Sequence, residues 1–134
     1  MSLTTEYDAI EQRFDTLWAG ATAVGYSSQK FTPTEAGSSV RLSILSGDAE
    51  QMSAGDPGNN VVRHVGIIVI EIYVPGGAGE SVVRSLADSA MDIFRNQVFG
   101  GVRCRVPYIS AKREEPPFLI WNVIIPFERD ETNG

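Results

Sequence analysis

The sequence predicts an α+β fold, in which a largely antiparallel mixed β-sheet is flanked by two main helices. Two segments place apolar residues at helical spacing, and several others alternate apolar and polar residues or run as continuous Val and Ile stretches, as strands do. These strands outnumber the segments that could cross over the sheet, so most of them can pair as antiparallel hairpins. The length of 134 residues predicts one domain spanning residues 1–134.

The first predicted helix follows Thr5, a favourable N-cap residue, and stops at Gly20. Its apolar stripe consists of Tyr7, Ile10, Phe14, Leu17 and Trp18. These side chains fall within an arc of about 100° on a helical wheel, so we expect them to face the core. Glu6 lies in the first turn, where the helix dipole favours an anion.

The second predicted helix follows a glycine-rich turn at residues 75–79. Its apolar face consists of Val82, Val83, Leu86, Ala87, Ala90, Ile93 and Phe94. Charged residues occupy the opposite side, which makes this the clearest amphipathic helix in the chain. The turn shares only its glycines with a phosphate-binding loop, because no Lys follows and Glu80 brings a negative charge to the helix start.

The predicted strands cover residues 22–26, 39–45, 61–75, 102–109 and 118–127. The longest runs from Val61 to Pro75, and its successive apolar residues indicate burial on both faces and a central place in the sheet. Gly66 within this strand indicates a bulge or a close backbone approach. Pro126 places the end of the last strand at an edge or a bulge.

Three polar segments are expected to lie outside the sheet. Residues 46–60 are rich in Gly, Asp and Asn, which predicts a long flexible loop. Residues 111–117 predict a charged turn closed by two prolines. Residues 128–134 predict a flexible polar tail.

The composition excludes several classes of protein. Seventeen Asp and Glu against eleven Lys and Arg give a net charge of −6, which disfavours a free-standing nucleic-acid binder. One cysteine and one histidine exclude an internal disulfide framework, a Cys-based zinc cluster and a multi-His metal site. No leader-like segment begins the chain and no apolar run is long enough to cross a bilayer, so we expect no membrane partner.

The sequence indicates no catalytic, cofactor-binding or metal-binding residue. His64 lies on a predicted strand and no Ser occupies a nucleophile-elbow pattern, although sequence distance alone does not exclude a Ser-His-Asp arrangement. Cys104 stands between two arginines, which can lower the pKa of a thiol, but a place in the sheet or core is the favoured interpretation. We therefore expect a protein that is not an enzyme and that needs no cofactor.

Charged residues in strands and in the long loop are the candidate interface residues. Arg41, Arg63, Arg103 and Arg105 lie on predicted strands, where burial of an unpaired charge would be costly. They are expected on a polar sheet face or in a subunit interface, where Arg binds carboxylates in bidentate fashion. The loop adds the acidic residues Asp48, Glu50 and Asp56, whose spacing matches no calcium-binding loop.

A set of short motifs spans nearly the whole chain. In order they are Trp18 at the end of the first helix, the segments 22–26, 31–33 and 40–42, a loop rich in Gly, Asp and Asn, the segments 63–66 and 73–79, Ala87-Asp88 and Ile93-Phe94 in the second helix, and Trp121 in the last strand. With this pattern the chain resembles the lambda-like tail terminator, or tail-completion, proteins of phages and prophages.

The resemblance implies a structural virion protein that forms a ring, typically a hexamer, from copies of itself. Such a ring caps the tail tube, ends tube polymerisation and presents the surface to which the head is joined. The implied partners are the tail-tube protein and a head-completion or connector protein, with DNA passing through and no specific DNA binding. The implied location is the virion tail, assembled in the bacterial host cytoplasm, and residues 47–60 are the candidate contact with the tube or head.

Two alternatives remain open at the level of sequence. A head–tail connector or a tail-tube subunit can use the same kind of small α+β domain with a long loop. A small-ligand-binding or enzymatic α+β domain would instead need convergent polar residues in a pocket.

Overall fold

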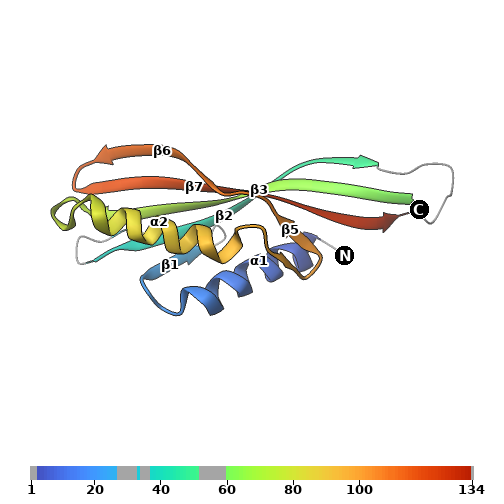
Figure 1. Ribbon diagram of the computed structural model, residues 1–134, viewed down its shortest axis with the longest axis horizontal. Coiled ribbons are helices and arrows are strands. Elements are labelled where there is room, and N and C mark those ends of the chain that lie inside the picture. Colours follow the sequence, from blue (N-terminus) through green and yellow to red (C-terminus); the bar gives the residue numbers. More distant parts are fainter. Residues whose placement is uncertain (1–2, 27–32, 34–36, 52–59, 134) are drawn as a thin grey trace.

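The computed structural model describes residues 3–26, 33, 37–51 and 60–133. In chain order the elements are α1 (Leu3–Trp18), β1 (Ala23–Tyr26), β2 (Ser39–Gln51), β3 (Asn60–Pro75), the short 3-10 helix η1 (Gly76–Ala78), α2 (Glu80–Phe94), β4 (Val98–Phe99), β5 (Val102–Cys104), β6 (Tyr108–Glu115) and β7 (Phe118–Asn133). Figure 1 shows the long strands running the length of the molecule, with both helices below the sheet.

The seven strands form one mixed sheet in the order β1-β2-β3-β7-β5-β4, and β6 also pairs with β7. Only β1 and β2 are parallel, whereas every other pair is antiparallel. The predicted α+β class, with a largely antiparallel mixed sheet and two helices, is confirmed.

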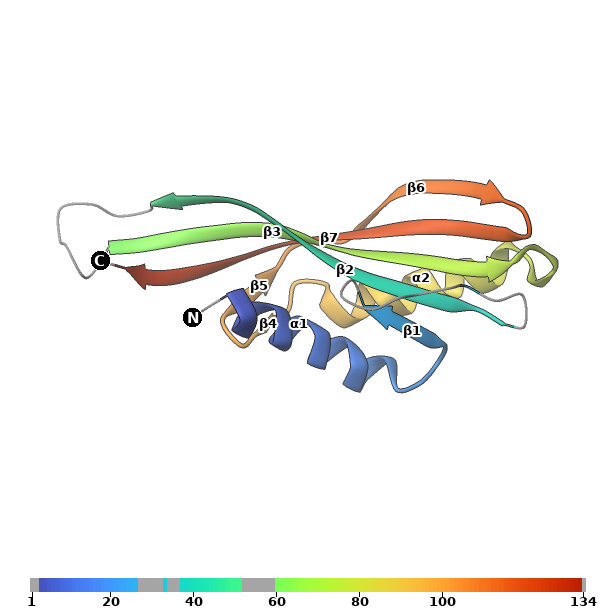
Figure 2. The ribbon, with the colours of Figure 1, turned by 180° about the vertical axis from the view of Figure 1, so that it is seen from behind.

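Both helices cover the same face of the sheet, as Figures 1 and 2 show from opposite sides. Because α1 and α2 turn their apolar stripes to the sheet, a continuous core forms between the layers. Phe14 of α1 stacks on Trp18 and Phe94, with ring centroids 5.0 and 6.2 Å apart. Leu17 departs from the prediction, because its side chain is 51% exposed.

The long central strands extend beyond the helices and form what we call the arm: residues 46–51 of β2, 60–66 of β3 and 127–133 of β7. Figures 1 and 2 show these three strands projecting past both helices. The prediction of a loop at residues 46–60 is therefore wrong for residues 46–51 and 60, while residues 52–59 lie outside the described residues. The predicted tail is also wrong for residues 128–133, which pair with β3.

Two further predictions need correction. Residues 111–115 belong to strand β6 rather than to a turn, and the chain reverses only at Pro116 and Pro117. Their charged side chains belong to a strand at the edge of the sheet, which tolerates polar residues. Thr5 lies inside α1, which begins at Leu3, so it is not the N-cap residue.

Gly66 is a point of close backbone approach, as the sequence predicts. A Cβ atom at this position would lie 2.7 Å from the backbone oxygen of Leu45 and 2.7 Å from the ring of Phe127. Phe127 stands directly opposite in β7 and is buried in the core. The glycine lets the three central strands cross closely where the arm begins.

Substitution of Gly66 tests this packing. Gly66→Ala is expected to lower the free energy of unfolding by about 1–3 kcal/mol, because the added methyl group must displace backbone or a core ring. Denaturant unfolding measures the effect. Gly77→Ala is the matched control, since a Cβ at Gly77 meets no atom within 4 Å. Equal stability of the two variants would contradict the close-packed crossing.

Candidate assembly interface

Three of the four strand arginines predicted as interface residues meet at the base of the arm. Arg63, Arg103 and Arg105 surround Glu128 and Asp130 on the helix-free face of the sheet, and we call these five residues the β7 charge cluster. Arg63 binds Asp130 through two hydrogen bonds, Nε to Oδ1 at 2.8 Å and Nη2 to Oδ2 at 3.2 Å. The Nη2 atoms of Arg103 and Arg105 donate to Asp130 at 3.0 Å and to Glu128 at 2.6 Å.

The strand register brings these charges together. Arg63 of β3 stands directly opposite Asp130 of β7, and Arg103 of β5 stands directly opposite Glu128. Side chains on such cross-strand positions have Cβ atoms about 5 Å apart, so opposite charges contact without bending the backbone. The cluster therefore ties β3, β7 and β5 together at the base of the arm, on the face of the sheet opposite the helices.

Electrostatics within the β7 charge cluster favour the ionised carboxylate of Asp130. Hydrogen bonds from Arg63 lower the pKa of Asp130 to about 2, helped by Arg103 and opposed by partial burial. Because the folded protein holds a carboxylate that the unfolded chain protonates near pH 3.8, the cluster stabilises the fold above that pH. This contribution is lost as the pH falls towards 2.

Arg41, the fourth predicted arginine, lies at the other end of the same sheet face. Its Nη1 atom lies 3.9 Å from Oε1 of Glu71, and Arg113 lies 3.4 Å from Oε2 of the same carboxylate. The Tyr73 hydroxyl also donates to Glu71, at 3.3 Å. Burial and the neighbouring Glu71 raise the pKa of Tyr73. The structure thus divides the predicted arginines between two separate groups.

The predicted acidic residues fall at the arm. Asp48 and Glu50 lie within β2, and the register places Glu50 directly opposite Arg63 of the β7 charge cluster. Asp56 lies outside the described residues. The backbone thus places two of the three acidic positions beyond the helices.

A buried ion pair on the helix-covered face was not predicted from the sequence. Nε of Arg129 lies 2.7 Å from Oε1 of Glu6, and the two residues are only 3% and 2% exposed. This pair ties the start of α1 to β7. A signal for it exists in residues 128–130, where acidic and basic side chains alternate as they do when successive residues of a strand point to opposite faces.

The residues considered for chemistry take structural positions. Burial raises the pKa of the Cys104 thiol to about 12, although a nearby Arg13 lowers it slightly, so the thiol stays protonated near neutral pH. His64 lies opposite Arg129 and Tyr73 opposite Ile120, which places His64 and Tyr73 on opposite faces of β3. Within the described ranges, no group of three or more His, Cys, Asp or Glu could hold a metal ion. No helix in that same part of the chain is long and apolar enough to cross a membrane.

The effect of pH on the β7 charge cluster can be tested with Asp130→Asn. The variant is expected to be less stable than the native chain above about pH 5, and the difference should shrink as the pH falls from about 4 to about 2. Denaturant unfolding across this range measures it. Asp88→Asn removes an exposed carboxylate of α2 outside the cluster and serves as the control. A stability difference independent of pH would contradict the role of the ionised Asp130.

Comparison with known proteins agrees with this architecture. The sequence model of a family described as "Phage tail terminator protein" matches residues 7–116. No curated protein matches the sequence. A solved structure that carries no descriptive name is 20% identical with a TM-score of 0.72, covering 96% of both chains. A chain from the "Virion of native gene transfer agent (GTA) particle" is 18% identical with a TM-score of 0.53, covering 97% of this chain and 100% of that one.

At these identities, the likeness to the two solved structures shows a shared fold and nothing further. The family match is the finding that carries identity, because residues 7–116 make up more than half of the chain. The chain belongs to the phage tail terminator family, and it is a structural protein of phage tails.

Proposed function

We propose that the protein caps the phage tail tube as a ring, stops polymerisation of the tube and forms the surface to which the head is joined. The family match over residues 7–116 is the observation that carries this proposal. A hexameric ring is the simplest form, with the tail-tube protein on one side and a head-completion or connector protein on the other. The ring would be assembled in the cytoplasm of the bacterial host.

The arm is the proposed contact with the tube or the head. It projects beyond the helices in Figures 1 and 2, so its strands can reach a neighbouring protein without moving the core. The β7 charge cluster and the glycine crossing at Gly66 fix its base. A contact made by a rigid element costs less conformational entropy than one made by a flexible loop. Asp48 and Glu50 of β2 supply acidic positions within the arm, and Asp56 is an acidic residue of the segment that follows β2 in the sequence.

The net charge of −6 suits a passage for DNA. Negative charge on the protein repels the phosphate backbone, so DNA can move past without being held. We therefore propose that DNA passes through the ring without specific binding, and we assign no catalytic role.

The proposed function is tested by mixing the purified protein with the tail-tube protein and measuring tube lengths by electron microscopy. The protein is expected to bind at tube ends and to shorten the tubes in proportion to its concentration. Incorporation along tubes would support a tube subunit instead. Binding only to the head portal would support a connector, and either result would contradict the proposal.

The arm contact makes a prediction of its own. Asp48→Lys combined with Glu50→Lys is expected to weaken tube termination about tenfold or more, because reversing charge at a contact replaces attraction by repulsion. The measurement is the concentration of protein that halves mean tube length. Asp88→Lys combined with Asp92→Lys makes the same charge change on the exposed side of α2 and should leave termination unchanged. If both double variants terminate tubes equally well, the arm does not make the proposed contact.

A further inference from the structure

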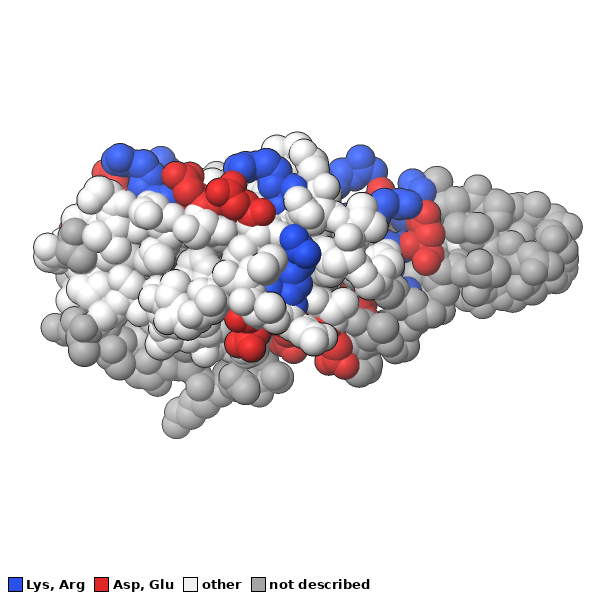
Figure 3. All heavy atoms as spheres, turned by 60° about the horizontal axis from the view of Figure 1, so that its bottom comes forward, with Lys and Arg blue, Asp and Glu red and all other residues white. Residues whose placement is uncertain are grey.

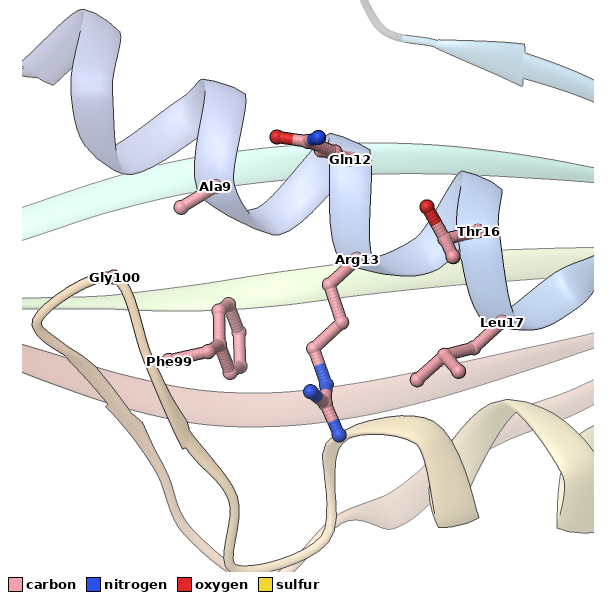
Figure 4. A pocket seen from close by; sticks show the side chains of 7 residues that line it. All are labelled: Ala9, Gln12, Arg13, Thr16, Leu17, Phe99 and Gly100. Carbon is pink, nitrogen blue, oxygen red and sulfur yellow. The ribbon is translucent and has the colours of Figure 1, made fainter.

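A groove lined by both apolar and polar side chains runs between α1 and the β4–β5 turn. Its volume is about 360 Å³, and Figure 4 shows Leu17 and Phe99 on either side of the Arg13 side chain, with Gly100 at one end. Leu17 is half exposed here although most of the apolar stripe of α1 is buried. A groove of this size and character is large enough to receive apolar side chains of another molecule.

The outer flank of α1 carries an acidic stripe made of Asp8, Glu11 and Asp15. These positions are spaced by three and four residues and therefore lie along one side of the helix. Desolvation and the neighbouring Asp8 raise the pKa of Glu11. Burial and the nearby Asp15 and Glu11 raise the pKa of Tyr26 to about 12. Burial is the larger cause of both pKa shifts, and the neighbouring carboxylates add to it.

The one cation of α1 does not neutralise the acidic stripe. Nε of Arg13 donates to the backbone oxygen of Ile93 at 2.8 Å, and the guanidinium lies 4.9 Å from the centroid of the Phe99 ring. Figure 4 shows this side chain reaching away from the helix towards the end of α2. Within the described part of the chain, no Lys or Arg forms an ion pair with Asp8, Glu11 or Asp15.

A second segment, which begins in β5 and continues into β6, has the complementary chemistry. The segment from Arg103 to Arg113 holds four cations and no Asp or Glu. Between the cations lie Val106 and Tyr108, whose side chains are 62% and 51% exposed. Although Arg103 and Arg105 contact carboxylates of β7, the arginine side chains are more exposed than their partners. Arg113 likewise pairs with Glu71 and Glu115. The segment thus carries exposed apolar side chains together with basic ones.

The figures place β6 opposite α1, whereas β5, in which the segment begins, lies beside α1. In both Figure 1 and Figure 2, β6 lies along the upper margin and α1 along the lower one. In Figure 3, acidic side chains lie along the lower margin, whereas the upper margin carries both basic and acidic ones. Two different complementary surfaces on one chain allow a head-to-tail contact that repeats around a ring, whereas a self-complementary patch would produce only a dimer.

We propose that the groove and acidic stripe of α1 bind the segment from Arg103 to Arg113 of the next copy of this chain. Val106 and Tyr108 enter the groove beside Leu17 and Phe99, while the cations around them face Asp8 and Asp15. This arrangement has an apolar centre and a charged rim, as stable protein interfaces have. The inference rests on the proposed ring and identifies the surfaces that close it.

The test uses two variants with reversed charge. Variant A carries Asp8→Lys and Asp15→Lys, and variant B carries Tyr108→Glu and Lys112→Glu. Each variant alone is expected to self-associate at least about tenfold more weakly than the native chain, because variant A sets two lysines against the basic segment and variant B sets two carboxylates against the acidic stripe. In an equimolar mixture, A and B can alternate, so that the lysines introduced in A meet the carboxylates introduced in B, and the acidic stripe of B meets the native basic segment of A. Sedimentation velocity on each variant and on the mixture measures the association.

Matched controls make the same changes in net charge on the exposed side of α2. Asp88→Lys with Asp92→Lys matches variant A, and Arg84→Glu with Ser85→Glu matches variant B. Both controls should associate as the native chain does. Restored assembly in the mixture of A and B also demonstrates that both variants are folded. A mixture that assembles no better than its components overturns the inference, as does a native chain that stays monomeric at high concentration.

The association experiment and the tube-length experiment can fail independently, so a failure of the proposed interface can be told apart from a failure of the proposed function. A native chain that associates through these surfaces but leaves tube length unchanged would retain the interface and contradict tube termination. A native chain that shortens tubes, while mixing A and B restores no association, would retain termination and contradict this interface.

Discussion

The pairing of β3 with β7 is the constraint on which the rest of the structure depends. Sixteen consecutive residues of β3, Asn60–Pro75, stand opposite Phe118–Asn133 without a register shift. A slip of one residue would turn the buried Ile and Val side chains of one strand to solvent. The apolar centre of the β3–β7 pair therefore also determines which residues stand opposite each other at the polar ends of the two strands. β2 then pairs along one side of this ribbon, and β5 and β6 along the other.

That fixed register lets a single strand serve two different environments. At the start of the arm, Arg129 points to the helix-covered face and meets Glu6, while Glu128 and Asp130 point to the other face and meet three arginines. Breaking the buried pair would leave one charge without its partner, which is costly in a protein interior. The partly exposed cluster instead gains strength because each carboxylate contacts more than one arginine. Because successive side chains of β7 point to opposite faces, one short segment of this strand both binds α1 and holds the charge cluster at the base of the arm.

The sequence predicts the fold where apolar periodicity is strong, and misses it where polar residues form strands. Both helices and the centres of β3 and β7 follow from repeated apolar positions, such as Phe14 and Phe94. The arm and β6 have no comparable apolar face, because strand pairing and charges support them rather than core packing. For the same reason, the sequence identified Arg63, Arg103 and Arg105 as related residues but not their partners Glu128 and Asp130, which were interpreted as a tail.

The internal pairing of these arginines changes what a contact between copies requires. An interface built on ion pairs to Arg63 would have to break its bidentate contact with Asp130 before any gain between subunits. Lys112 lies over the ring of Trp121 instead of forming an ion pair there, and Arg105 is largely exposed beside Glu128. In the proposed contact, the combined positive charge of the segment from Arg103 to Arg113 would then attract the next copy, and the ion pairs within each copy would stay intact. Such attraction would orient the subunits, while the exposed Val106 and Tyr108 would provide the apolar surface whose burial holds them together.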